Sequence, residues 1–423
     1  MLLEFRLRNY RTFRDEATLS LIASPDRALL EENTAKADLR GAFRSVRSAA
    51  VYGPNAGGKT TLLRALQLMR GVVVESAALS PDQQLNVQPF RLDEDSKDKP
   101  TLFEATILIG GVRHQYGFEF TARRIVSEWL LVYQTARPQR WISREFNQAT
   151  NSEEFEFSTH LAGPKRVWQD ATRPNGLFLS TAIQLNSEAL RPLFQWFNVA
   201  LNIFLDGGQI PFEFSTNMIA KDPRAILAML TAADMGITNI EVERTKGVQH
   251  SFTFDSQTRQ IQTSDGEAEI AIPKFQHSAG TVRAQFDYVD ESQGTQKLFA
   301  LAGPILDIID KGYLLVIDEL DRSLHPLLVR QIVETFHDPA INTRGAQLIF
   351  STHDTSLLDP ALLRRDQVWF VEKDETQAAK LAPLADFAPR KNEAFEKGYL
   401  TGRYGGVPVL TRRLLPKGVS AKR

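Results

Sequence analysis

The chain has 423 residues, of which 43% are apolar, so it can bury a substantial core. Its formal net charge of -1 gives no global field for nucleic acid or membrane surfaces, and any such contact must be local. The absence of cysteine excludes disulfides, cysteine-bound metals and thiol catalysis, and favours a reducing compartment. Because no signal peptide or long apolar stretch is present, we expect a cytoplasmic protein without membrane contact.

The first segment should contain a strand, a glycine loop followed by a helix, and an antiparallel sheet. Leu3, Phe5 and Leu7 alternate with charged residues, which is typical of a half-buried strand. Residues 49–70 pass from a short apolar run through a glycine turn into an amphipathic pattern, which predicts a strand, a loop and a helix. Residues 101–133 hold two or three alternating runs, which favours an antiparallel sheet forming a distinct β lobe.

The middle segment, residues 136–285, is expected to be an inserted helical and β lobe. Residues 136–180 are polar with scattered tryptophans, which indicates strands and loops. Over 187–205 the spacing predicts one helix, with an apolar face of Leu190, Leu193, Phe194, Phe197, Leu201 and Phe204. A second helix is predicted over 222–236, with a proline in its first turn and a glycine at its end. Residues 238–290 then return to alternating, strand-like sequence.

The last segment, residues 286–423, is expected to complete an α/β domain begun by residues 1–135. Apolar strands over 313–319 and 347–354 are preceded and separated by amphipathic helices. Alternating buried strands and helices indicate a parallel sheet that is covered by helices.

The sequence "GPNAGGKT", Gly53 to Thr60, matches the phosphate-binding P-loop and lies between the expected strand and helix. Its glycines let backbone N–H groups close around phosphate oxygens, and the helix N-terminus adds positive potential. Lys59 would reach the β and γ phosphates of ATP, and the Thr60 hydroxyl would ligate Mg²⁺. The predicted nucleotide-binding residues of this loop are Gly53, Pro54, Asn55, Ala56, Gly57, Gly58, Lys59, Thr60 and Thr61.

Acidic residues follow the buried run "YLLVI" as Asp318 and Glu319, which resembles a Walker B strand. A parallel strand delivers such residues to the ligand-binding edge of its sheet. We expect Asp318 to hold Mg²⁺ through water and Glu319 to act as the general base. The alternative is a strand that simply runs into a charged turn.

His353 ends the second apolar strand, at the same expected sheet edge. There it can donate a hydrogen bond to the γ-phosphate and sense whether that phosphate is present. A purely structural histidine is the alternative. His325, shortly after the acidic pair, is the one further histidine whose position is suggestive.

In this order, the elements resemble the ABC-type ATPase heads of the recombination and chromosome-maintenance class. "ESQGTQ" is similar to the signature sequence of that class, with Ser292 and Gly294 in the positions of its serine and glycine and Gln293 in place of its second glycine. The resemblance implies that Asp321 lies in a D-loop at a dimer contact. Gln88 is a candidate glutamine-loop residue, and an ordinary loop residue is the alternative.

Three stretches narrow the resemblance: residues 291–328, residues 342–359 and the late "YLTGRYGGVPVL". They are similar to stand-alone bacterial ATPases of the AAA-15/AAA-21 group, and thereby to ATPase halves of OLD-family nucleases and ATPases of restriction and abortive-infection loci. This resemblance implies a homodimer or larger oligomer in which Ser292 and Gly294 cap the γ-phosphate held by another copy. It also implies a role in phage defence or DNA maintenance.

The implied partners are an effector protein, such as a Toprim-like nuclease or a toxin, or DNA. Only about seventy residues follow His353 and their acidic residues are scattered, so we expect no nuclease within this chain. Two alternatives stay open: a nucleotide-dependent scaffold that sequesters a toxic partner, and a DNA-repair ATPase. The C-terminal tail is basic and is either solvated or a phosphate-backbone contact, through Arg412, Arg413, Lys417, Lys422 and Arg423.

Overall fold

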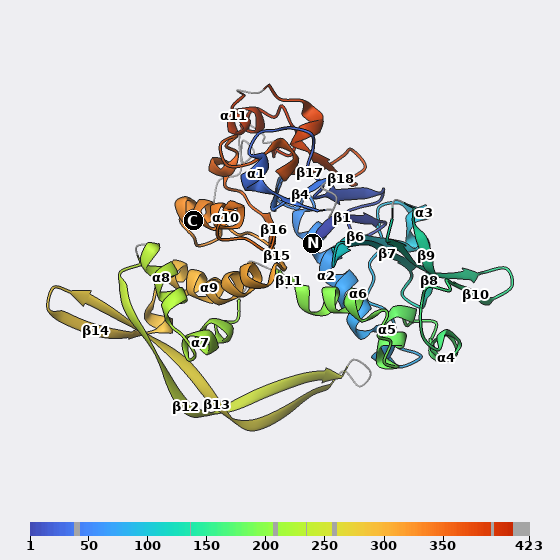
Figure 1. Cartoon of the computed structure of the whole chain (residues 1–423), viewed down its shortest axis with the longest axis horizontal. Coiled ribbons are helices and arrows are strands. Elements are labelled where there is room, and N and C mark those ends of the chain that lie inside the picture. The colour runs from blue at the N-terminus through green and yellow to red at the C-terminus, as the bar shows by residue number, and fades with distance from the viewer. Residues whose placement is uncertain are drawn as a thin grey trace, which may run out of the picture. The chain divides into compact units, whose positions relative to one another are not determined.

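In the computed structural model the chain forms two compact units (Figure 1). The first comprises Met1–Gly207, Lys311–Asp321 and Arg330–Arg423, and the second comprises Gly208–Asp310 and Arg322–Val329. The structure describes residues 1–37, 43–135, 137–205, 210–233, 235–255, 260–390 and 393–408, with backbone alone over 247–255 and 260–270. The basic tail that begins at Arg412 lies outside the described residues.

An antiparallel seven-stranded sheet in the first unit includes the predicted N-terminal strand. In β1 the side chains of Leu3, Phe5 and Leu7 are buried and those between them are partly exposed, as predicted. β1 also pairs with β6, so the strands over 101–133 are not the distinct lobe expected, because their pairing extends the N-terminal hairpin. The strand order is β10 (Ser152–Phe157), β9 (Gln139–Asn147), β8 (Ile125–Tyr133), β7 (Val112–Phe120), β6 (Thr101–Ile109), β1 (Leu2–Arg8) and β2 (Ala17–Ser20).

A second sheet in the first unit has six strands, and the predicted parallel arrangement is confirmed there. The first five strands pair in parallel, and only β18 is antiparallel to its neighbour. Strands β15, β16 and β5 are buried along their whole length, as their mainly apolar sequences predict. The strand order is β11 (Leu201–Phe204), β15 (Leu314–Ile317), β16 (Gln347–Ser351), β5 (Ser48–Tyr52), β17 (Val368–Lys373) and β18 (Ala379–Pro383).

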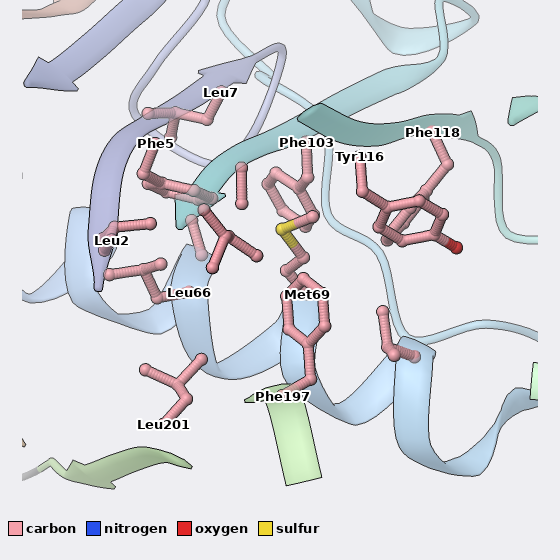
Figure 2. Packing of buried hydrophobic residues seen from close by; sticks show 14 of the residues in the cluster. Leu2, Phe5, Leu7, Leu66, Met69, Phe103, Tyr116, Phe118, Phe197 and Leu201 are labelled. Carbon is pink, nitrogen blue, oxygen red and sulfur yellow. The ribbon is translucent and has the colours of Figure 1, made fainter. Parts of the chain in front are cut away.

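Helix α2 (Lys59–Glu75) joins the P-loop to the core of the first unit. Figure 2 shows Leu66 and Met69 of this helix facing β1 residues and Phe103, with Phe197 nearby. The helix runs five residues past its expected end, because Val72 and Val73 continue the buried face beyond Gly71. The loop is thereby anchored at both ends, by a buried strand before it and a buried helix after it.

The single helix expected over 187–205 is wrong. The chain forms α6 (Arg191–Gln195) and a π-helical turn (Trp196–Ala200), and then Leu201–Phe204 become strand β11. Leu201 and Phe204 are three residues apart, so they fit a helical spacing, but their backbone pairs with Leu314–Ile317 of β15. This segment therefore belongs to the parallel sheet of the first unit instead of an inserted helical lobe.

The second unit is built around one long helix and a β ribbon, within the described residues. The strands predicted over 238–290 are present as β12 (Ile237–Asp255), β13 (Gln260–Ala279) and β14 (Val282–Asp287), which pair in antiparallel fashion and which Figure 1 shows as an extended ribbon. Helices α7 (Glu213–Ile219) and α8 (Arg224–Ala232) precede it, and α9 (Gln293–Lys311) follows it.

The boundaries of the two units differ from those of the three segments expected. Residues 136–207 lie with the first unit, because β9 and β10 extend its antiparallel sheet and β11 its parallel sheet. Residues 286–310 lie with the second unit, as part of β14 and α9. The remaining elements are α1 (Leu30–Asn33), β3 (Thr34–Lys36), β4 (Arg44–Val46), η1 (Ser76–Ala78), α3 (Glu94–Lys97), α4 (Lys165–Ala171), α5 (Phe178–Gln184), η3 (Tyr288–Asp290), α10 (Pro326–His337), η4 (Thr355–Leu357), η5 (Arg365–Gln367), η6 (Leu384–Phe387) and α11 (Phe395–Leu400).

Across the described ranges, every helix is too short or too polar to span a membrane.

A buried histidine ties α10 to the P-loop strand. His337 Nε2 lies 2.8 Å from Ser48 Oγ and 3.1 Å from the Gln367 side-chain nitrogen. Because the side-chain nitrogen of Gln367 can only donate, His337 Nε2 must accept, which requires a neutral imidazole. Burial, assisted by the positive charge of Arg47, lowers the pKa of His337 to about 3.

We predict that His337 makes the protein lose stability as the pH falls. The unfolded histidine takes up a proton near pH 6.5 and the folded one only near pH 3, so acid favours the unfolded state throughout that interval. Between pH 7 and pH 5 the contribution to the free energy of unfolding falls by about 2 kcal/mol. Urea denaturation of wild type and His337→Gln at both pH values measures it. Equal losses in the two proteins would contradict this assignment.

Candidate functional site

The P-loop has no room for side chains at its glycines. A Cβ on Gly53 would lie 2.2 Å from Val371 O, and one on Gly57 would lie 3.0 Å from Pro54 O. Gly58 has a φ of +127°, and a Cβ there would meet Val371 Cγ1 at 3.0 Å. The loop is therefore a cradle of backbone atoms packed on β17, followed directly by the N-terminus of the 17-residue helix α2.

Lys59 is buried with its ammonium group inside this loop. Its Nζ donates hydrogen bonds to Gly53 O at 2.8 Å and Pro54 O at 3.3 Å. Burial lowers the pKa of Lys59, and the carboxylates of Asp318, Glu319 and Asp321 act against that shift. The loop thus holds a cation that nearby anions stabilise, in the segment where phosphate is expected to bind.

Ser351, at the end of β16, holds the two acidic residues that follow β15. Its hydroxyl donates to Asp318 Oδ1 and accepts from the Glu319 backbone N–H at 2.8 Å. Asp318 is buried, and its own N–H donates to Phe204 O of β11 at 2.9 Å. Glu319 has a φ of +52°, a conformation that costs about 1–3 kcal/mol and that these surrounding bonds maintain.

His353 lies close enough to these groups to interact with them electrostatically. Its backbone N–H donates to Asp321 Oδ2 at 3.2 Å. Burial and the charge of Lys59 lower the pKa of His353, while Asp321, Glu319 and Asp318 act in the opposite direction. The imidazole is therefore neutral at pH 7 and can donate one hydrogen bond. Predicted residues from three distant parts of the sequence thus converge at one edge of the parallel sheet.

A pocket beside the P-loop involves residues that the sequence reasoning missed. Arg11 donates its backbone N–H to Gln88 O at 2.7 Å, which places Gln88 next to the loop. Thr12 accepts from Ala379 N at 2.7 Å, and a Cβ on Gly58 would lie 3.3 Å from its hydroxyl. The pocket has a volume of about 320 Å³ and is lined by Arg11, Thr12, Thr61, Gln88, Arg91 and Lys373, among others.

Two buried atoms in this pocket, Arg11 Nε and Thr12 Oγ1, have no hydrogen-bond partner in the described part of the chain. Asp321 Oδ1, three residues after Asp318, is also buried and has no hydrogen-bond partner within the described ranges. Such atoms are costly unless a ligand or water satisfies them. The polar turn "NYRTF" after the first strand is the feature of the sequence that could have identified Arg11 and Thr12 as site residues. With the side-chain-free cradle, these donors and acceptors fit a magnesium-bound nucleotide.

Ser292 and Gly294, the other predicted site residues, belong to the second unit. Ser292 is exposed and caps α9, since its Oγ accepts the Thr295 N–H at 3.1 Å. A Cβ on Gly294 would lie 2.9 Å from Ser323 O, so glycine is needed for the close approach of that loop. His325, in the same unit, accepts the N–H of Leu327 through Nδ1 and caps the start of α10.

Comparison with known protein families gives a match over most of the chain. The profile of a family described as "AAA domain, putative AbiEii toxin, Type IV TA system" matches residues 48–359, about three quarters of the chain. The match runs from the P-loop strand past His353. Among curated proteins none matches the sequence significantly. A solved structure of an SmcHead bound to the C-winged helix domain of ScpA is similar at 12% identity, covering 90% of this chain and 97% of that chain, with a TM-score of 0.40.

We predict opposite effects for two glycine substitutions, one in the P-loop and one in α2. Gly53→Ala would force a methyl group onto a backbone oxygen, which costs about 1–3 kcal/mol of stability and distorts the phosphate cradle. Gly71→Ala, within α2, meets nothing within 4 Å and should add roughly 0.5–1 kcal/mol. Thermal unfolding and the binding of a fluorescent ATP analogue measure both. Retained affinity in Gly53→Ala would show that the cradle is not the phosphate site.

Proposed function

The chain belongs to the AAA_21 family, and we propose on that premise that it binds Mg-ATP at Gly53–Thr60 and hydrolyses it. One observation carries the proposal: Lys59, Asp318, Glu319 and His353 meet at one sheet edge, where the two carboxylates oppose the lowering of the pKa of Lys59 and of His353 by burial. A structural turn beside a charged strand end would not require a buried lysine among three carboxylates. The absence of cysteine supports a cytoplasmic location for this activity.

The chain's own groups account for phosphate binding. Backbone N–H groups of the loop and of the first turn of α2 would bind phosphate oxygens, as would Lys59 after leaving Gly53 O. Arg11 and Thr12 would use their unpartnered atoms on the nucleotide, next to Gln88. Thr60 and Asp318 would hold Mg²⁺, which when bound neutralises charge on the β and γ phosphates.

Glu319 would accept the proton of the attacking water. Its backbone N–H is fixed by Ser351, and the same hydroxyl orients Asp318, so the base and the metal-holding carboxylate keep one relative geometry. His353, neutral at pH 7, would donate to a γ-phosphate oxygen. The attack breaks the bond between the γ-phosphorus and the bridging oxygen and releases ADP and phosphate.

We further propose that the ATP-bound site is completed by a second copy of the chain, in a homodimer. Ser292 is exposed at the N-terminus of the 19-residue helix α9, where backbone N–H groups favour anions. By the resemblance to ABC-type heads, Asp321 would lie at the same contact.

The proposed cycle of dimer formation and release would gate an effector, such as a Toprim-like nuclease or a toxin, or DNA. We infer an anti-phage setting from the resemblance to ATPases of abortive-infection loci, and the family description, which names a putative AbiEii toxin and a Type IV TA system, supports a toxin as the effector. A nucleotide-dependent scaffold that sequesters a toxic partner would need ATP binding and little turnover. The turnover number of the free protein separates these two roles.

We predict that Glu319→Gln binds ATP but hydrolyses it about 10²–10⁴-fold more slowly, because the general base is lost. The variant should accumulate as a dimer when ATP and Mg²⁺ are added, which size-exclusion chromatography with light scattering measures. Glu154→Gln, a change at an exposed position of β10, is the matched control and should behave as wild type. A strictly monomeric Glu319→Gln protein in saturating ATP would rule out the dimer.

Ser351→Ala should lower the hydrolysis rate about 10–100-fold, the usual cost of losing a group that orients a metal ligand. The variant should also need more Mg²⁺ for half-maximal rate, whereas its affinity for ATP without Mg²⁺ stays unchanged. Ser356→Ala, which removes only an exposed bond to Asp354, serves as the control. An unchanged Mg²⁺ requirement would mean that Ser351 does not position Asp318.

A further inference from the structure

Strand β14 forms an exposed edge of the ribbon in the second unit. In the described part of the chain it has β13 on one side and no strand on the other. All its residues but the last are exposed, and its apolar members Val282 and Phe286 are 67% and 41% exposed. An edge of this kind presents unpaired backbone groups to any extended segment that fits it.

The hairpin turn determines which backbone groups point outward. Gly280 and Thr281 form a two-residue turn, and Gly280 has a φ of +62°. The closing pair, Ala279 and Val282, therefore bonds across the turn, and the bonding direction alternates along the strand. The N–H and C=O groups of residues 283, 285 and 287 consequently face away from β13.

The side chains of β14 are complementary to a second β14 in antiparallel orientation. When Gln285 lies opposite Gln285 of the second copy, Arg283 lies opposite Asp287 and Ala284 lies opposite Phe286. Each charge then meets its opposite, and each small residue meets a large one. Pairing centred one residue away, on Ala284 or Phe286, loses both Arg–Asp pairs, so charge selects a single register.

Asp287 can pair with Arg283 of a second copy and keep the ion pair that it forms within its own chain. It already forms an ion pair with Lys274 of β13, which also contacts Glu243 at 3.3 Å. A carboxylate has about four acceptor positions, so an arginine can be added to the same group. Arg283 is exposed on the same face, two residues from Gln285.

We propose that β14 pairs with β14 of a second copy, which joins two ribbons into one continuous antiparallel sheet. This contact uses residues 282–287 and no nucleotide, and so it is distinct from the ATP-dependent dimer through Ser292. Two six-residue strands share few hydrogen bonds, so the contact alone is weak and adds to the affinity of any second interface between the same copies.

Cysteine cross-linking tests the register, because the chain contains no cysteine of its own. In the proposed register the Gln285 Cα atoms of the two copies are about 5.5 Å apart, within reach of a short bis-maleimide. Gln285→Cys should form several-fold more covalent dimer than Arg283→Cys. In the proposed register, position 283 lies opposite position 287 of the second copy, four residues away from position 283 of that copy. A mixture of Arg283→Cys and Asp287→Cys should cross-link between the two variants. All three positions are exposed or partly exposed, so these variants should fold.

The result should be the same without nucleotide and in a Lys59→Ala background, which separates this contact from the ATP-dependent dimer. Monomeric Gln285→Cys protein at micromolar concentration would overturn the proposal. Equal cross-linking of Arg283→Cys and Gln285→Cys would also overturn it, because it would show random collision. Failure of either kind leaves the proposed ATP hydrolysis untouched.

Discussion

The meeting of adjacent parallel strands at one sheet edge is the constraint on which the site depends. β15, β16 and β5 are hydrogen-bonded neighbours, and each ends at the same edge. The buried apolar side chains of these strands fix their register. The residues that follow the strands are brought together by this register and need no contacts of their own to meet. The P-loop, the acidic pair and His353 therefore meet because of core packing in residues that never touch a ligand.

The same sheet edge contains a backbone conformation and buried polar atoms that lower the stability of the fold. Glu319 occupies a left-handed backbone conformation, and the Ser351 hydroxyl and the strand ends hold it there. Lys59 is buried against carbonyl oxygens, and buried polar atoms of Arg11, Thr12 and Asp321 lack partners in the described ranges. Each feature is unfavourable for an isolated fold and favourable for a fold that receives an anion and a metal ion.

The sequence predicts the parts of the fold that depend on local pattern. The P-loop and the strands that precede Asp318 and His353 were identified because motif, apolar run and turn lie within a few residues of one another. Strand β11 was missed because Leu201 and Phe204 fit a helix as well as a strand, and only pairing with a distant β15 decides between them. The roles of Arg11 and Gln88 depend on a contact between segments that are far apart in the chain.

The second unit carries the residues on which both proposed contacts between copies depend. Ser292 caps α9 and remains exposed, Gly294 permits a close backbone approach to Ser323, and β14 offers a self-complementary edge. Both proposed contacts join copies of the same chain, one dependent on nucleotide and one independent of it. Two weak contacts between the same pair of molecules reinforce each other, so ATP could switch an assembly that is already held together.

The most direct test of the account is whether the two halves of one ATP site come from two molecules. Lys59→Ala removes the cation proposed to bind phosphate from the first unit, and Ser292→Arg blocks the proposed cap in the second. Each variant should be inactive alone, and mixing them should restore hydrolysis, because each mixed dimer keeps one intact site. A mixture as inactive as its components, although the two variants associate, would contradict the claim that the site is completed by a second copy.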